Sequence, residues 1–244
     1  LTMKEISRDS DLTLQTVATG THLIKEYGET IREIQSDGFP IDDTVHLFPV
    51  SDCASEIASA FGRGVGGFSD VISRLDPDII LVLGDRYEIF AAVIAATIHH
   101  IPIAHCHGGE LTRGSMDDSF RHAITKMSYL HLTSHELYRK RVIQLGEDPD
   151  MVINVGAFGL EAIDRGKLLE KNDLETNLGR KLGKKNILVA YHPETNAPRS
   201  IQTDFQAVLD AVGACPDLTI FFTLSNADEG GRLINEMIKR YTNK

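Results

Sequence analysis

Short apolar runs alternate with longer amphipathic stretches along nearly the whole 244-residue chain. Several of the short runs are rich in β-branched residues without strict polar–apolar alternation, which is typical of strands buried on both faces. Strands are predicted at residues 13–18, 44–47, 79–83, 101–105, 130–133, 152–155, 187–191 and 219–223. Helices are predicted at residues 23–37, 55–74, 89–99, 117–128, 136–145, 200–215 and 230–241. This order predicts an α/β fold with parallel, doubly wound sheets.

A charged stretch at residues 166–185, poor in apolar side chains, predicts a boundary between two domains. We assign residues 1–170 to an N-terminal Rossmann-like domain and residues 171–244 to the start of a second one. Only two predicted strands follow the boundary, and two strands do not make a stable sheet of this class. The first residues also have the pattern of the end of a helix. We therefore expect that both ends are cut, with the first strand missing and the second domain incomplete.

Charge and cysteine content restrict the function. The formal net charge of −10 argues against a nucleic-acid partner, which requires a basic face. The three cysteines, Cys53, Cys106 and Cys215, are far apart and odd in number, which favours the reducing cytoplasm over a disulfide framework. The longest apolar runs, six to eight residues, are too short to cross a membrane. A homo-oligomer is expected, and apolar helices such as the one at residues 89–99 could supply its interface.

Polar side chains directly follow four of the predicted strands. In open parallel sheets, ligands bind beyond the carboxyl ends of the strands. An Asp in this place is more often a helix cap than a catalyst, but four such segments on one rim favour a functional site. The segments are Gly84-Asp85-Arg86, His105-Cys106-His107-Gly108-Gly109-Glu110, Tyr191-His192-Pro193-Glu194 and Ser225-Asn226-Ala227-Asp228.

The segment with two histidines and two glycines is the most informative of the four. Paired glycines allow a sharp turn or a close approach of the backbone to a ligand. His105 and His107 would lie on one side of a continuing strand, which suggests a metal, but no third ligand follows at a suitable spacing. We therefore expect no metal, and favour an imidazole that orients a neighbouring side chain.

The helix predicted at residues 117–128 opens with two acids and carries Arg121 and His122 one turn later. One interpretation is a pair of surface contacts, Asp117 with Arg121 and Asp118 with His122, and acids that complement the helix dipole. The other is an acid/base aspartate held by Arg121. The preceding loop brings Glu110 close to the two acids, and neighbouring carboxylates can acquire different pKa values.

Taken together, these motifs resemble those of the bacterial hydrolysing UDP-N-acetylglucosamine 2-epimerases of sialic and related nonulosonic acid pathways. The resemblance implies two Rossmann-like domains of glycosyltransferase-B type, a UDP-sugar substrate, and no metal or redox cofactor. The matching segments are Thr19-Gly20-Thr21-His22, Gly84-Asp85-Arg86-Tyr87-Glu88, His105 to Glu110, Asp117-Asp118 with Arg121-His122, Arg141 to Glu147, and His192-Pro193-Glu194-Thr195.

The resemblance also implies roles for individual residues. Asp85, Asp117 and His192 match catalytic positions of the family. Relatives of the animal bifunctional type have a glutamate at the position of His107 and also keep the one at Glu110, so an acid/base role of that first glutamate would fall here to His107 or to Glu110. We favour Glu110 for proton transfer and place His107 near the leaving group. Substrate binding is assigned to Arg86, Gly108, Gly109, Arg121, His122, Ser225, Asn226 and Asp228.

The implied reaction converts UDP-N-acetylglucosamine, or a 4-acetamido-4,6-dideoxy analogue, into UDP and an N-acetylmannosamine-type sugar. It passes through a 2-acetamidoglucal intermediate. Two other interpretations stay open: a glycosyltransferase of the same architecture, and a non-catalytic module that binds nucleotide sugars. Analogy of fold does not decide among them, whereas release of UDP without an acceptor would favour the epimerase.

Overall fold

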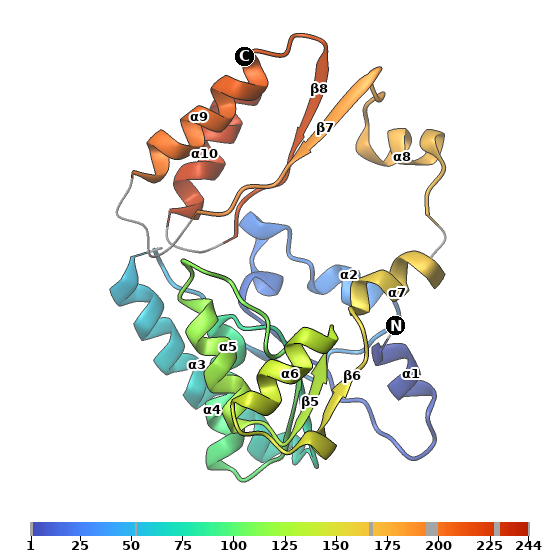
Figure 1. Cartoon of the computed structure of the whole chain (residues 1–244), viewed down its shortest axis with the longest axis vertical. Helices are drawn as coiled ribbons and strands as arrows, with labels where there is room; N and C mark the ends of the chain where they lie inside the picture. Colours follow the sequence, from blue (N-terminus) through green and yellow to red (C-terminus); the bar gives the residue numbers. More distant parts are fainter. Residues whose placement is uncertain (1, 52, 166–167, 194–199, 227–229, 244) are drawn as a thin grey trace. The chain divides into compact units, whose positions relative to one another are not determined.

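The computed structural model describes residues 2–51, 53–165, 168–193, 200–226 and 230–243 (Figure 1). The chain divides into two compact units, the first made of residues 1–51 and 55–165, and the second of residues 52–54 and 166–244. Every strand pair in both units is parallel. The nucleotide-binding role assigned to the second domain stays a prediction.

The first unit carries most of the secondary structure. Its strands are β1 (Val17–Thr19), β2 (Asp43–Val45), β3 (Ile80–Leu83), β4 (Ile103–Cys106), β5 (Leu130–Thr133) and β6 (Val152–Asn154). Its helices are α1 (Thr2–Arg8), α2 (Ile31–Ser36), α3 (Ala54–Leu75), α4 (Tyr87–Ile98), α5 (Asp117–Met127), α6 (Glu136–Gln144) and α7 (Phe158–Arg165). Short 3-10 turns lie at η1 (Gly20–Leu23), η2 (Lys25–Tyr27) and η3 (Pro149–Met151).

Strands β3 to β6 form one sheet in which neighbours in sequence are also neighbours in space. The register places Leu83 beside Cys106, and Cys106 beside Leu132. The carboxyl ends of β3, β4 and β5 therefore meet at the same edge, as expected for the segments that follow them. Strands β1 and β2 pair with each other in a separate two-stranded sheet.

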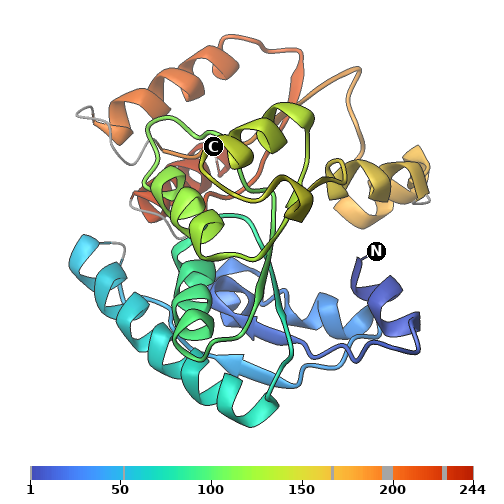
Figure 2. The ribbon, with the colours of Figure 1, turned by 60° about the horizontal axis from the view of Figure 1, so that its bottom comes forward.

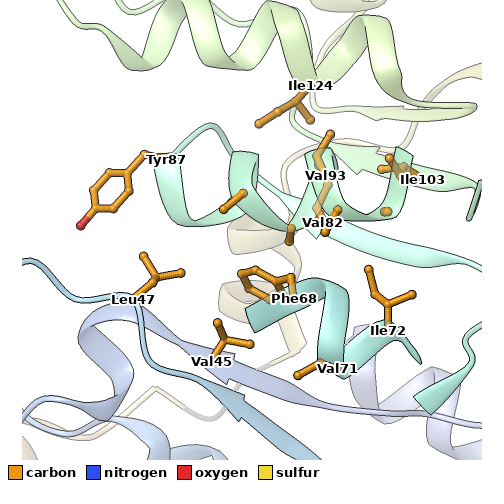
Figure 3. Close-up of a cluster of buried hydrophobic side chains, with 14 of the residues drawn as sticks. Val45, Leu47, Phe68, Val71, Ile72, Val82, Tyr87, Val93, Ile103 and Ile124 are labelled. Atoms are coloured by element: carbon orange, nitrogen blue, oxygen red, sulfur yellow. The ribbon is translucent and has the colours of Figure 1, made fainter. Parts of the chain in front are cut away.

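The core of the first unit lies between α3, α4 and the sheet. Helix α3 runs as one long helix (cyan in Figure 2), and its apolar stripe buries Phe68, Val71 and Ile72. These side chains pack in one cluster with Val82 of β3 and Tyr87 of α4 (Figure 3). Burial of such side chains stabilises a fold by about 1.5–3 kcal/mol each, so this cluster fixes α4 against the sheet.

Helix α4, suggested above as a possible oligomer interface, packs most of its apolar side chains into that core. Ala91, Val93, Ala95 and Ala96 are at most 1% exposed, because the helix lies between the sheet and its neighbouring helices. Ile98, at the end of the helix, is 66% exposed. A helix apolar all round is typical of a buried element, so the apolar sequence here reports burial within one chain.

The predicted helix at residues 23–37 is interrupted. Ile24 has an extended backbone between η1 and η2, and Gly28 adopts a left-handed conformation with φ of 90°. A residue with positive φ cannot continue a right-handed helix, so α2 begins only at Ile31. The charged stretch predicted to hold the domain boundary contains α8 (Lys171–Leu178), which is followed by the left-handed Gly179 as its C-cap.

The second unit contains, besides α8, the elements β7 (Lys185–Val189), α9 (Ile201–Gly213), β8 (Leu218–Phe222) and α10 (Gly231–Thr242). Helices α9 and α10 pack together on one side of the β7–β8 pair (Figure 1). Phe205, Leu209, Ile234 and Ile238 form its buried cluster. Within the described ranges of the whole chain, no helix has both the length and the apolar character of a membrane span.

Candidate active site

A buried histidine holds the turn that follows β3. His105 of β4 is fully buried, and its Nε2 lies 2.8 Å from the carbonyl oxygen of Gly84. Because a carbonyl only accepts, Nε2 donates, and the neutral ring accepts at Nδ1 from the Thr125 hydroxyl at 3.2 Å. Burial lowers the pKa of His105 to about 4. His105 is thus the orienting imidazole that the sequence predicted, and it ties the Gly84 turn to α5.

The lowered pKa of His105 makes stability depend on pH. Between about pH 6.5 and pH 4 the unfolded chain binds this proton more readily than the folded chain, so acidification across this window favours unfolding. By about pH 4, this shift lowers the free energy of unfolding by about 3 kcal/mol relative to neutral pH. We expect His105→Gln, which keeps a donor for Gly84 but does not titrate, to lose less stability than wild type between pH 7 and pH 4.

Free energies of unfolding from urea titrations at several pH values test this expectation. His100→Gln is the matched control, because His100 is exposed at the end of α4. The effect of His105→Gln is compared with that of His100→Gln at each pH. A constant difference between His105→Gln and wild type would show that the native ring is not held neutral.

Arg121 is the centre of the site. It lies on α5 and is 5% exposed. Its Nη1 donates to the carbonyl oxygen of Glu110 and to Oδ1 of Asp118, both at 3.1 Å. Its Nη2 donates to Oδ2 of Asp85 and, at 2.8 Å, to Oγ1 of Thr112. All four amino hydrogens can therefore be used within the protein, and the guanidinium joins the segments after β3 and β4 to α5.

The electrostatics of Asp85 suit an acid/base group. Burial raises the pKa of Asp85, while the charges of Arg121 and Arg86 lower it and that of Glu110 raises it. The Asp85 and Glu110 carboxylates are thus close enough to interact, on a common edge of the sheet. A carboxyl group with opposing influences on its pKa, beside a buried guanidinium, is characteristic of catalytic sites.

The Glu110 side chain makes a second set of contacts in the site, beside those of Arg121. Its Oε1 is 2.9 Å from Nδ1 of His107 and accepts from the Ser134 hydroxyl at 2.5 Å. Ser134 follows β5 directly, so three consecutive parallel strands each contribute a group to this edge. The turn between His107 and Glu110 depends on Gly109, which has a φ of 80° and whose carbonyl accepts from Arg141.

The remaining predicted residues of the first unit lie around this network. Asp117 is the first residue of α5 and is half-buried. His122 lies 3.9 Å from Asp118, as the i,i+4 spacing predicted. Arg86 pairs with the buried Glu88 at 3.2 Å. The site assignments of these three residues stay predictions.

The predicted residues of the second unit form no network of comparable density in its described part. His192 and Asn226 are exposed, while Ser225 is 1% exposed and pairs through its backbone with the Asn235 side chain. Asp228 lies outside the described residues. Their assigned roles stay predictions.

Three contributors to the first-unit network were missed by sequence reasoning: Thr112, Thr125 and Ser134. Ser134 could have been found, because it follows a predicted strand directly, like Asp85. Thr112 and Thr125 carry no such signal in the sequence. Among the residues described, no group of three or more His, Cys, Asp or Glu side chains is arranged to hold a metal ion.

The profile of the UDP-N-acetylglucosamine 2-epimerase family matches residues 4–244. The chain belongs to this family. The match covers the network around Arg121 and both units, and it confirms the resemblance found from the motifs.

Three relatives of this epimerase-family chain are 37–40% identical to it. The GDP/UDP-N,N'-diacetylbacillosamine 2-epimerase (hydrolyzing) of Campylobacter jejuni is 40% identical over 98% of this chain and 62% of its own length. The polysialic acid biosynthesis protein P7 of Escherichia coli is 40% identical over 95% and 59%. The UDP-N,N'-diacetylbacillosamine 2-epimerase (hydrolyzing) of Legionella pneumophila is 37% identical over 98% and 63%. The chain thus spans about three fifths of the length of these relatives.

Solved structures of the epimerase family share the fold. UDP-GlcNAc 2-epimerase from Neisseria meningitidis, bound to UDP-GlcNAc, superimposes with a TM-score of 0.74 at 19% identity, over 96% of this chain and 64% of that one. A UDP-GlcNAc 2-epimerase from Rickettsia bellii gives a TM-score of 0.64 at 18% identity, over 95% and 67%. This likeness confirms the predicted α/β fold of glycosyltransferase-B type.

Proposed function

We propose that the protein is a hydrolysing 2-epimerase that converts a UDP-linked 2-acetamido sugar into UDP and the corresponding N-acetylmannosamine-type sugar. The observation that carries the proposal is a connected network at one edge of the sheet. Arg121 donates to Asp85 and to the Glu110 carbonyl, and the Glu110 carboxylate contacts His107. The family match and the relatives named as hydrolysing 2-epimerases support it.

The proposed reaction has two stages. A base removes the proton on sugar C2 while the bond between C1 and the UDP oxygen breaks, and the electron pair of the C–H bond becomes the double bond of a 2-acetamidoglucal. Water then adds to C1, and a proton returns to C2 on the opposite face. This chemistry needs at least two positioned acid/base groups, which we assign to Asp85, Asp117 and the coupled pair of Glu110 and His107. It uses no metal or redox cofactor.

Two sugars are candidate substrates. UDP-N-acetylglucosamine is supported by the ligand of the N. meningitidis structure. A 4-acetamido-4,6-dideoxy analogue is supported by two of the relatives above, both named for diacetylbacillosamine. We assign substrate binding to Arg86, the Gly108-Gly109 turn, Arg121 and His122 in the first unit, and to Ser225, Asn226 and Asp228 in the second. His192, also in the second unit, keeps its assignment as a catalytic residue. Comparing the turnover rates of the two nucleotide sugars shows which one is preferred.

We further propose a cytoplasmic location and a homo-oligomer. The three cysteines are odd in number and far apart in the sequence, which favours a reducing compartment. Strand β3 carries Leu81 and Leu83, which are 42% and 55% exposed. Exposed apolar side chains that are clustered on one element favour association.

Turnover in heavy water tests the reaction. We expect the protein to release UDP from one of the two nucleotide sugars without an acceptor, and the released sugar to carry deuterium at C2 in its NMR spectrum. Product that keeps only the C2 hydrogen of the substrate would exclude the elimination route. Release of UDP only after an acceptor is added would indicate a glycosyltransferase, and binding without turnover would indicate a non-catalytic module.

A further inference from the structure

One oxygen of the Glu110 carboxylate contacts two neighbouring side chains. This oxygen, Oε1, faces Nδ1 of His107 at 2.9 Å and the Ser134 hydroxyl at 2.5 Å. Two donors on one oxygen fit an ionised carboxylate, which only accepts. Nδ1 of His107 must then carry its hydrogen. A neutral imidazole with the hydrogen on Nδ1 has its lone pair on Nε2.

That second nitrogen is the unpartnered atom of the group. Nε2 of His107 is buried and has no hydrogen-bond partner among the described residues. The ring meets Phe158 edge-on, with 5.4 Å between the centroids. A buried acceptor without a partner is unfavourable, because it loses its hydrogen bonds to water and gains none in the protein. A hydrogen supplied by a bound molecule would remove this cost.

The backbone of His107 is strained as well. Its φ is 66°, in the left-handed region, and its N–H donates to the Leu132 carbonyl at 2.9 Å. Such a conformation is strained for a non-glycine residue and is found where the surrounding structure enforces it, often at functional sites. The conformation sets the ring beside Glu110 at the end of β4.

We propose that Nε2 of His107 transfers the C2 proton, and that Glu110 and Ser134 are positioning residues that fix the tautomer of the ring. This proposal rests on the proposed function and revises the role that the sequence suggested for Glu110. The C2 proton moves to Nε2, the C–H electron pair forms the C1–C2 double bond, and the C1–O pair leaves with UDP. The resulting imidazolium is stabilised by the Glu110 carboxylate at Nδ1.

The test uses His107→Gly, because glycine accepts the left-handed φ without strain and leaves space for a small base. We expect kcat to fall on the order of 10²–10⁴-fold, and to rise again with the concentration of added imidazole. His100→Gly is the matched control: His100 also has a left-handed φ, 59°, but lies exposed at the far end of α4. It should keep the wild-type rate, with or without imidazole.

A second variant separates the two candidate bases. Glu110→Ala should lose activity that neither imidazole nor acetate restores, because the orientation of His107 is lost while its ring remains. Rescue of Glu110→Ala by acetate, or no response of His107→Gly to imidazole, would overturn the assignment.

The tautomer gives a readout that does not depend on turnover. Long-range ¹H–¹⁵N NMR of the wild-type protein should show the His107 hydrogen on Nδ1, and Ser134→Ala should weaken this preference. A hydrogen on Nε2 would refute the proposal even in an active enzyme. If the protein turns over neither nucleotide sugar while the Nδ1 tautomer is found, the proposed reaction fails and the arrangement of Ser134, Glu110 and His107 stands.

Discussion

Replacing Arg121 by methionine should lower the free energy of unfolding by about 3–5 kcal/mol. The Arg121 side chain is 6% exposed, and its removal leaves the Asp85 and Asp118 carboxylates without their shared cation. Methionine fills a similar volume but donates no hydrogen bond. Since a domain is stable by only about 5–15 kcal/mol, the loss would be a large part of the total. The pKa of Asp85 should also rise further, because the Arg121 charge lowers it.

The matched control is Arg74→Met. Arg74 pairs with Asp43 at 2.6 Å, but its side chain is 57% exposed. An exposed pair of this kind contributes about 0.2–1 kcal/mol. Urea denaturation of both variants, with NMR titration of Asp85, measures the effects. Equal small losses at the two positions would show that the Arg121 network does not stabilise the fold.

Gly109→Ala is expected to cost about 2–5 kcal/mol. A β-carbon at this position would lie 2.5 Å from the carbonyl oxygen of Tyr138 and 2.8 Å from Cγ2 of Val142, both on α6. Forcing extra atoms into a packed core costs typically about 1–3 kcal/mol. The φ of 80° adds about 1–2 kcal/mol for an L-residue. The turn that carries His107 and Glu110 would also shift, so activity should fall together with stability.

Gly38→Ala separates the two contributions. Gly38 has a φ of 90° with no atom within 4 Å of the added β-carbon. Its replacement should therefore show only the backbone contribution of about 1–2 kcal/mol. Thermal or urea unfolding of both variants gives the comparison. A loss at Gly109 no larger than that at Gly38 would mean that α6 moves away without cost.

The sequence predicts the strand at residues 130–133 with the observed bounds. Burial on both faces holds for β4, all of whose residues are buried, but not for β3, where Leu81 and Leu83 are exposed. The sequence also predicts the edge of the sheet at which Asp85 and Glu110 come together, since the carboxyl ends of parallel strands share an edge. It fails at residues 23–37, where the amphipathic pattern continues across the left-handed turn at Gly28. Periodicity reports which face is apolar but not whether the backbone is continuous.

Partner choice within the site is the part that the sequence cannot give. Helical spacing puts Asp117 and Asp118 both within reach of the next turn, but it does not show that Arg121, besides donating to Asp118, also donates to Asp85 on the neighbouring loop. In the same way, the spacing of His105 and His107 suggests equivalent rings on one side of a strand. The structure makes them different, because one is buried beneath the Gly84 turn and the other leaves the strand with a positive φ.

The hydrogen bond from the His107 backbone to Leu132 extends the pairing of β4 and β5 by one residue beyond β4 itself. The proposed proton-transfer ring is therefore anchored to the last rung of a β-ladder. The ring is already oriented in the ligand-free protein, so little conformational entropy of the His107 side chain is lost when a ligand binds. We therefore expect His107 to move little when a ligand binds, and the conformational changes on binding to occur in the surrounding loops.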